Sequence, residues 1–204
     1  MNKEEREQII AMMNREVVPA IGCTEPIAVA LAVAKATEVL SVLPERIDVF
    51  LSANMLKNAM GVGIPGTGMV GLPIAIALGA LIGKSNYLLE VLKDTTPEAV
   101  EKGKQYIAEN RIHIAQKTET AEKLYIEVRV QNGSGKAKVI ISHDHTNFTW
   151  ISKNDEVILD MRAISYKDMK NHPLIKLIIN ILSNNSTRFF ESYIKDFKLN
   201  LNNF

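Results

Sequence analysis

The single cysteine of the chain, Cys23, stands directly before Thr24-Glu25-Pro26, a sequence typical of a helix start with Thr24 as the capping residue. A thiol at a helix N-terminus lies near the positive end of the helix dipole and near unpaired N–H groups, which favour the thiolate. A thiolate can bind a metal or attack a substrate, whereas the Glu25 carboxylate opposes loss of the proton. The alternative is that Cys23 is a small buried residue without a chemical role.

A second polar group lies in SANMLKN, residues 52–58. Asn54, Lys57 and Asn58 are three or four residues apart, so a helix presents them on one face. A lysine beside two amides can bind a carboxylate. The alternative is an ordinary solvated helix face.

A glycine-rich loop, GVGIPGTGMVG, follows at residues 61–71. Its backbone N–H groups precede the start of an apolar helix and can bind an anion. The loop lacks the Gly-Lys-Ser/Thr ending of a Walker A motif and the glycine spacing of a dinucleotide fingerprint. A tight connection between packed helices is the alternative.

His143 and His145 are two residues apart in SHDHTN, residues 142–147. On a strand, this spacing places both imidazoles on one face, where they can bind a metal. The sequence offers no obvious third ligand, so an exposed polar strand face is the alternative.

The bulk properties exclude several classes of protein. A net charge of +1 gives no electrostatic signature of nucleic acid or of an anionic membrane as partner. One cysteine cannot form an internal disulfide, and the charged start MNKEEREQII is not a signal peptide. The longest apolar run, residues 68–83, is short for a membrane span. We therefore expect a cytoplasmic protein that binds neither nucleic acid nor membranes.

Hydrophobic periodicity predicts the elements that position these residues. Helices come first in the chain and antiparallel strands later, with a hairpin turn at Asn132-Gly133-Ser134-Gly135. This order predicts an α+β fold: a helical N-terminal part with a buried helix after the glycine loop, a mostly antiparallel sheet, and a C-terminal helix. The predicted helices span residues 3–17, 25–40, 53–60, 72–83, 95–110 and 172–198, and the predicted strands lie within 46–52, 111–116, 123–132, 135–152 and 156–162.

Two long blocks, residues 17–36 and 51–81, resemble proteins related to the iron–sulfur L-cysteine desulfidases, which are similar to the α subunit of iron–sulfur L-serine dehydratases. The resemblance continues through LEVLKD at 89–94 and through His145-Thr146-Asn147. It implies conversion of L-cysteine to pyruvate, ammonia and hydrogen sulfide. It also implies a [4Fe–4S] cluster held by three cysteines, with one iron open to the substrate.

The same resemblance implies roles for individual residues. Cys23 matches the first cluster ligand, and Thr24 and Glu25 are placed among the catalytic residues together with Lys57. The expected substrate-binding residues are Asn54, Asn58, Gly66, Thr67, Gly68, His145 and Asn147. We expect Cys23, Lys57 and Gly66 to converge on one face of the domain.

The sequence departs from that pattern in one respect, because the other cluster cysteines belong to a C-terminal half that has no counterpart here. One cysteine cannot hold a [4Fe–4S] cluster. We therefore expect one N-terminal portion of a larger lyase, helical over 1–94, mixed over 95–165 and helical over 166–204. Alone it would bind no cluster and be inactive.

The partners expected from this interpretation are a small amino acid, the missing half in cis or in trans, and a second copy of the chain in a homodimer. Exposed apolar surface on the helices at 25–40 and 72–83 is expected to seat the half or the copy. Two alternatives for function stay open: elimination from L-serine, and a binding or assembly module without catalysis.

Overall fold

The computed structural model describes residues 2–16 and 19–162 of the 204-residue chain. The chain divides into a unit at Met1–Met161 and a unit at Arg162–Phe204. The predicted helix at 172–198 therefore lies outside the described residues. Among the described helices, none has both the length and the apolar character required to cross a membrane.

A six-stranded mixed sheet organises the first unit, in the order β4-β1-β5-β6-β7-β8. Neighbouring strands are antiparallel except for β1 and β4, which run parallel. This arrangement of helices and a mostly antiparallel sheet confirms the predicted α+β class. The strands are β1 (Arg46–Leu51), β4 (Ile112–Gln116), β5 (Tyr125–Asn132), β6 (Gly135–Ser142), β7 (Phe148–Lys153) and β8 (Glu156–Asp160).

The alternation of side chains explains why one face of the sheet is apolar. In β5, Ile126, Val128 and Val130 are buried in the core, whereas Glu127 and Arg129 belong to the opposite face. The hairpin between β5 and β6 forms as predicted: Asn132 pairs with Gly135, and Gly133 has a φ of 54°. The parallel pairing of β1 with β4 requires a long crossover. It is supplied by α3 (Ala53–Ala59), α4 (Leu72–Leu81), η1 (Ser85–Glu90) and α5 (Pro97–Ala108).

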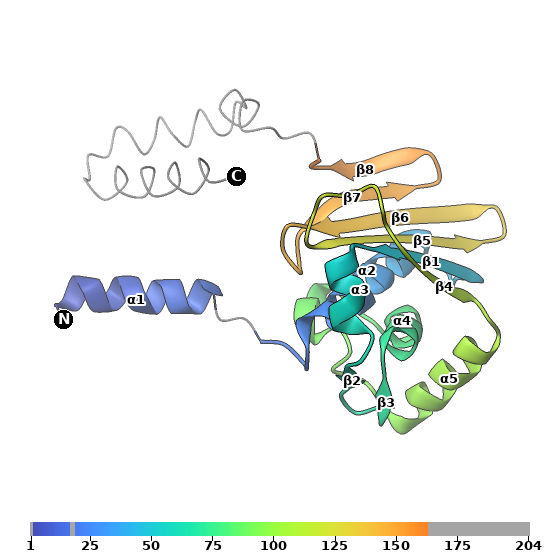
Figure 1. Cartoon of the computed structure of the whole chain (residues 1–204), viewed down its shortest axis with the longest axis horizontal. Helices are drawn as coiled ribbons and strands as arrows, with labels where there is room; N and C mark the ends of the chain where they lie inside the picture. The colour runs from blue at the N-terminus through green and yellow to red at the C-terminus, as the bar shows by residue number, and fades with distance from the viewer. Residues whose placement is uncertain (1, 17–18, 163–204) are drawn as a thin grey trace. The chain divides into compact units, whose positions relative to one another are not determined.

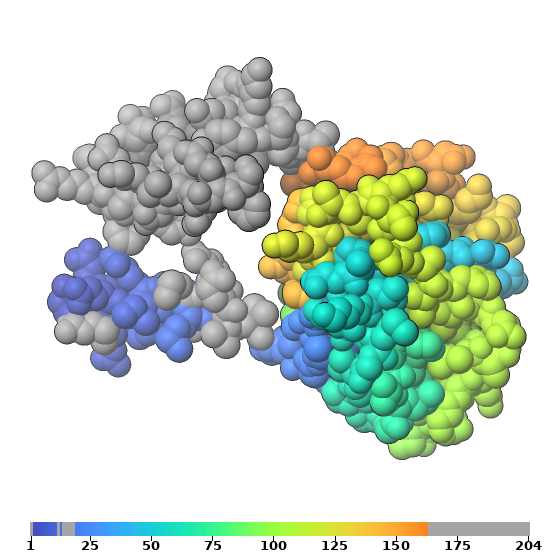
Figure 2. All heavy atoms as spheres, in the orientation of Figure 1, coloured from blue at the N-terminus to red at the C-terminus, as the bar shows by residue number. Residues whose placement is uncertain are grey.

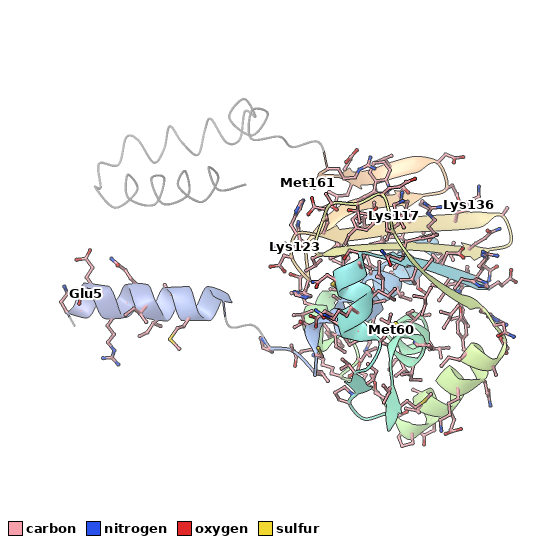
Figure 3. All side chains as sticks on the ribbon, in the orientation of Figure 1. Glu5, Met60, Lys117, Lys123, Lys136 and Met161 are labelled. Carbon is pink, nitrogen blue, oxygen red and sulfur yellow. The ribbon has the colours of Figure 1, made fainter. Side chains whose placement is uncertain are left out.

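Four short elements lie within the crossover between β1 and β4. Helix α3 (Ala53–Ala59) lies on the surface of the unit (Figure 2), and Met60 at its end is 62% exposed (Figure 3). Within the loop, β2 (Gly63–Ile64) and β3 (Met69–Val70) form a small antiparallel ribbon that the sequence did not predict. The 3₁₀ segment η1 (Ser85–Glu90) was also not predicted.

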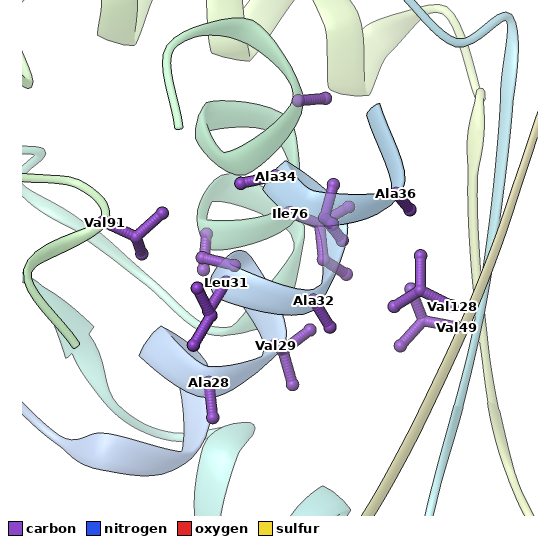
Figure 4. Close-up of a cluster of buried hydrophobic side chains, with 14 of the residues drawn as sticks. Ala28, Val29, Leu31, Ala32, Ala34, Ala36, Val49, Ile76, Val91 and Val128 are labelled. Atoms are coloured by element: carbon purple, nitrogen blue, oxygen red, sulfur yellow. The ribbon is translucent and has the colours of Figure 1, made fainter. Parts of the chain in front are cut away.

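The core is built on two helices that are buried on nearly all sides, α2 (Thr24–Leu40) and α4 (Leu72–Leu81). Helices α2, α4 and α5 (Pro97–Ala108) lie on one side of the sheet (Figure 1). Figure 4 shows α2 between α4 and the strands, with Ala32 and Ala36 on the side of Val49 and Val128.

The close packing of α2 against α4 depends on small residues. A Cβ atom on Gly79 would lie 2.6 Å from the carbonyl oxygen of Ala30, so only glycine permits this approach. The expectation of free apolar surface on these two helices was wrong, because residues 26–34 of α2 and most of α4 are buried. Exposed apolar side chains instead occur on α1 (Lys3–Glu16), at Ile9, Ile10 and Met13.

Candidate functional site

Cys23 is the N-cap residue of α2, with extended backbone dihedrals (φ −67°, ψ 133°), and its side chain makes no capping hydrogen bond. Thr24 is the first helical residue, so the prediction that Thr24 caps the helix was wrong by one position. Gly22, with a φ of 85°, turns the chain into the helix. A Cβ atom there would lie 2.8 Å from Cγ of Pro65, so the segment carrying Cys23 packs directly on the glycine-rich loop.

The carboxylate of Glu25 joins side chains from separate parts of the fold. Cys23 Sγ donates a hydrogen bond to Oε2 at 2.9 Å, and Thr24 Oγ1 donates to the same oxygen at 3.3 Å. Asn58 Nδ2 in α3 donates to Oε1 at 3.2 Å. Hydrogen bonds from Cys23 and Asn58 lower the pKa of Glu25, and His145, in the turn after β6, adds a smaller electrostatic contribution in the same direction. The start of α2 and helix α3 therefore meet at Glu25.

The two pKa values at this pair move in opposite directions. The hydrogen bond to Glu25 is the main cause of the raised pKa of Cys23, and burial adds to it. The hydrogen bond from Cys23 is the main cause of the lowered pKa of Glu25. Backbone N–H groups at the helix start do favour the thiolate, but the neighbouring carboxylate outweighs them. At neutral pH the pair is therefore a protonated thiol beside an ionised carboxylate.

Helix α3 begins at a Ser52 cap that also anchors it to the chain before β5, and its polar face is exposed. Ser52 Oγ accepts from the N–H of Met55 at 3.4 Å and donates to the carbonyl of Lys123 at 2.8 Å. Met55 and Ala59 are buried, which leaves the opposite face exposed. That face carries Asn54, Lys57 and Asn58, as the spacing predicted, and of these Asn58 reaches Glu25.

The glycine-rich loop is stabilised by its own threonine. Thr67 Oγ1 donates to the carbonyl of Ile64 at 2.7 Å and accepts from the N–H of Met69 at 3.0 Å. Gly66 and Gly68 on either side have φ values of 77° and 64°. Thr67 therefore has a clear structural role in the turn, and the predicted contacts of these three residues with a substrate remain predictions.

The predicted strand through residues 142–147 is a turn, because β6 ends at Ser142. Asp144 Oδ1 accepts from the N–H of Thr146 at 3.1 Å, and Asn147 Nδ2 donates to the carbonyl of Ser142 at 3.0 Å. These local bonds compete with strand pairing. The two histidines consequently share no strand face.

The two histidines of this turn have different surroundings. His143 has a φ of 71°, and its Nδ1 lies 3.2 Å from Glu122 Oε2. His145 instead makes a small electrostatic contribution to the lowered pKa of Glu25. Over residues 2–16 and 19–162, no three histidine, cysteine or acidic side chains are grouped so that they could hold a metal ion.

Sequence reasoning missed the contribution of η1 to this site. The carbonyl of Leu89 accepts a hydrogen bond from the N–H of Ile21 at 3.0 Å and so fixes the segment that precedes Cys23. The signal in the sequence was the block at 89–94, LEVLKD, whose charged residues match no catalytic or binding motif.

Comparison with known proteins finds the chain similar to proteins named UPF0597. It is 63% identical over 174 residues to a UPF0597 protein of Bacteroides fragilis, and 59% identical over 174 residues to one of Bacteroides thetaiotaomicron. A UPF0597 protein of Clostridium perfringens is 45% identical over 165 residues. These matches cover 85%, 85% and 81% of this chain, but 41%, 41% and 38% of the relatives.

The chain thus spans about two fifths of the length of the curated relatives that it matches. No protein-family model and no solved structure matches it. The relationship inferred from residues 17–36 and 51–81 was therefore wrong: the similar proteins are named UPF0597, and none of their names is that of a cysteine desulfidase or a serine dehydratase. By sequence, this chain is similar to UPF0597 proteins.

Proposed function

We propose that this chain supplies the substrate-binding part and an acid–base pair of a lyase that eliminates hydrogen sulfide from L-cysteine. The observation that carries the proposal is the hydrogen bond from the Cys23 thiol to the Glu25 carboxylate, 2.9 Å long, in a partly exposed site. β-Elimination requires a base for the Cα proton and an acid for the leaving group, and this pair offers both.

The proposed reaction balances on these two groups. The Glu25 carboxylate takes the Cα proton, and the electrons of that bond form the Cα=Cβ double bond. The Cβ–S bond breaks, and the departing HS⁻ takes the proton of the Cys23 thiol to form hydrogen sulfide. Transfer of the proton from Glu25 to Cys23 along their hydrogen bond restores the pair. The released aminoacrylate reacts with water to give pyruvate and ammonia.

The neighbouring residues support this division of roles. Asn58 Nδ2 donates to the second oxygen of Glu25, which stabilises the ionised form and fixes its orientation. Thr24 Oγ1 does the same at the oxygen that also accepts from Cys23. Lys57 precedes Asn58 on the exposed face of α3 and remains a proposed catalytic group, with Asn54 as a proposed substrate contact.

A [4Fe–4S] cluster does not fit the donors of this chain. Its single cysteine supplies one thiol, and the carboxylate of Glu25 raises the pKa of that thiol, which opposes the thiolate that a cluster requires. A cluster in a longer protein, with Cys23 as one ligand, would need further cysteines from outside this chain.

The first test uses the full-length B. fragilis relative and this chain, both purified without oxygen and assayed with L-cysteine and with L-serine. We expect the full-length relative to release pyruvate and sulfide in equal amounts from L-cysteine. Faster pyruvate release from L-serine would favour a dehydratase with the same elimination chemistry. A full-length relative that turns over neither amino acid would contradict the proposal and favour a binding or assembly module.

The second test uses a chimera in which residues 1–162 of this chain replace the matching segment of that relative. Glu25→Gln should lower kcat by about 10²-fold or more, because it removes the base. Glu98→Gln is the matched control, since Glu98 also lies in the first turn of a helix, α5. Equal activity of the two variants would contradict the role of Glu25.

A further inference from the structure

A cavity of about 320 Å³ lies next to the segment that leads to Cys23. Its volume is at the small end of the range for ligand pockets, roughly 300–1,000 Å³, so it suits a small molecule. Its walls come from three separate segments and include Pro19, Tyr87, Leu88, Glu90, Lys93 and Thr146.

The cavity carries one side chain of each charge. Glu90 and Lys93 are three residues apart, and the N–H of Lys93 donates to the carbonyl of Glu90 at 2.9 Å. Lys93 Nζ lies 3.6 Å from the centroid of the Tyr87 ring, which holds the ammonium group at the wall while leaving it able to donate hydrogen bonds. In the part of the chain that the structure describes, neither Glu90 nor Lys93 forms a salt bridge. Both charges are therefore available to a ligand.

The cavity and the Cys23–Glu25 pair share two backbone segments. The N–H of Ile21, two residues before Cys23, donates to the carbonyl of Leu89 in η1 at 3.0 Å. Thr146 lines the cavity, and the preceding residue, His145, contributes electrostatically to the lowered pKa of Glu25. A molecule in the cavity is thus bordered by the same segments that position the pair.

We propose that this cavity binds a small zwitterionic α-amino acid, with its carboxylate on Lys93 and its ammonium group on Glu90. Pro19 and Leu88 in the wall favour a short, uncharged side chain over a long or charged one. The binding assignment stands on the cavity itself, whereas presentation of the β-substituent to Cys23 and Glu25 rests on the function proposed above.

The test is a titration of the chain with four probes: L-serine, L-alanine, propionate and propylamine. Binding is measured by calorimetry and by amide NMR. We expect saturable binding of both amino acids, and affinities at least about tenfold weaker for propionate and propylamine, because each lacks one charged group. Lys93→Met and Glu90→Gln should each weaken L-serine binding by about tenfold or more.

Lys102→Met is the matched control, because Lys102 is exposed on α5 and away from the cavity lining. Thermal unfolding of every variant shows whether it is folded, and NMR shifts at Thr146 and Leu89 report binding in the cavity independently of substitution. Absence of amino-acid binding would overturn the proposal, as would binding that survives Lys93→Met and Glu90→Gln. Loss with Lys57→Met instead would move the site to α3 and also overturn it.

The outcome is separable from that of the proposed lyase. Binding of L-serine in the cavity, together with a full-length relative that turns over neither amino acid, keeps the cavity assignment and refutes the reaction. Turnover by the full-length relative, without amino-acid binding at Lys93 and Glu90, would support the reaction and refute the cavity assignment.

Discussion

Two glutamates of this protein show how differently one side chain can be used. Glu127 in β5 is 1% exposed and is surrounded by cations, with Lys138 Nζ at 3.3 Å and Lys117 Nζ at 3.5 Å. Glu25 is partly exposed and is surrounded by a thiol, a hydroxyl and an amide. The first carboxylate is fixed as an anion by full charges, whereas the second shares its environment with a group that can exchange a proton.

The surroundings of Glu127 are completed by two further side chains. Arg129 Nε donates to Oε1 at 2.7 Å, and the hydroxyl of Tyr125 donates to Oε2 at 2.7 Å. The Arg129 guanidinium also lies 4.8 Å from the centroid of the Phe50 ring. These donors and charges lower the pKa of Glu127 to about 2 even though burial alone would raise it. Such a carboxylate stabilises the sheet and has no proton to exchange at neutral pH.

The largest effect is expected when Glu127 is removed. Glu127→Ala leaves Arg129, Lys117 and Lys138 gathered without their anion, so we expect the free energy of unfolding to fall by about 2–4 kcal/mol. Urea denaturation followed by circular dichroism measures this loss. Glu156→Ala, at an exposed position on β8, is the control and should change stability little. A loss at Glu127 no larger than at Glu156 would show that the cations repel each other less than the geometry implies.

The same carboxylate should produce a pH dependence of stability. Because the folded state lowers the pKa of Glu127 to about 2, its stabilisation is complete above the unfolded pKa of about 4.3 and is lost as pH falls from there through 2. The full change amounts to about 3 kcal/mol. Unfolding free energies of wild type and Glu127→Gln, measured from pH 7 to pH 2, should therefore converge toward the acid end. A constant difference would contradict the assignment.

Sequence patterns predicted the helices and strands that carry both glutamates, but not the side chains that contact the two carboxylates. The strand predicted within 123–132 formed, and its alternation puts Glu127 and Arg129 on one face. Lys138 reaches Glu127 through strand pairing and Lys117 through the segment after β4, which no local pattern encodes. The polar face of α3 was likewise predicted, whereas the hydrogen bond from Asn58 to Glu25 joins residues 33 positions apart. Local periodicity specifies faces, and tertiary packing decides which faces meet.

The errors at the site also have physical reasons. Helix propensity could not distinguish Thr24 from Cys23 as the cap, because the choice depends on the positive φ of Gly22 and on its contact with Pro65. The strand predicted through His143 ended early because Asp144 bonds its local backbone instead. Both errors arise where a turn interrupts a regular pattern: the first turn is set by a contact across the fold, and the second by local side-chain hydrogen bonds.

A smaller effect is expected from rebuilding the turn before Cys23. Gly22→Ala adds a methyl group 2.8 Å from Cγ of Pro65 at a φ of 85°, so both strain and a clash result. Gly68→Ala is the matched control, since its φ of 64° brings strain but its surroundings are open. We expect Gly68→Ala to cost about 1 kcal/mol and Gly22→Ala about 2 kcal/mol or more, measured by urea denaturation. Equal losses would mean that Pro65 moves aside without cost.

The smallest change in stability, with the clearest chemical consequence, is expected from Glu25→Gln. This substitution removes the carboxylate that is the main cause of the raised pKa of Cys23, so that pKa should fall and the thiolate fraction at pH 7 should rise. The rate of iodoacetamide alkylation, followed by mass spectrometry from pH 6 to pH 10, measures the shift on this single thiol. Glu98→Gln is the control and should leave the profile unchanged.

Asn58→Ala tests the same pair by removing the hydrogen bond to the other oxygen of the Glu25 carboxylate. Without the Asn58 amide, the ionised form of Glu25 loses a hydrogen bond, and the pKa of Glu25 should rise. Cys23 would keep its charged neighbour at pH 7, so alkylation should be affected far less than by Glu25→Gln. If Asn58→Ala instead accelerated alkylation as strongly, then Asn58 rather than the negative charge would control the thiol. Glu25 would then be a structural carboxylate like Glu127, and the contrast between the two glutamates would disappear.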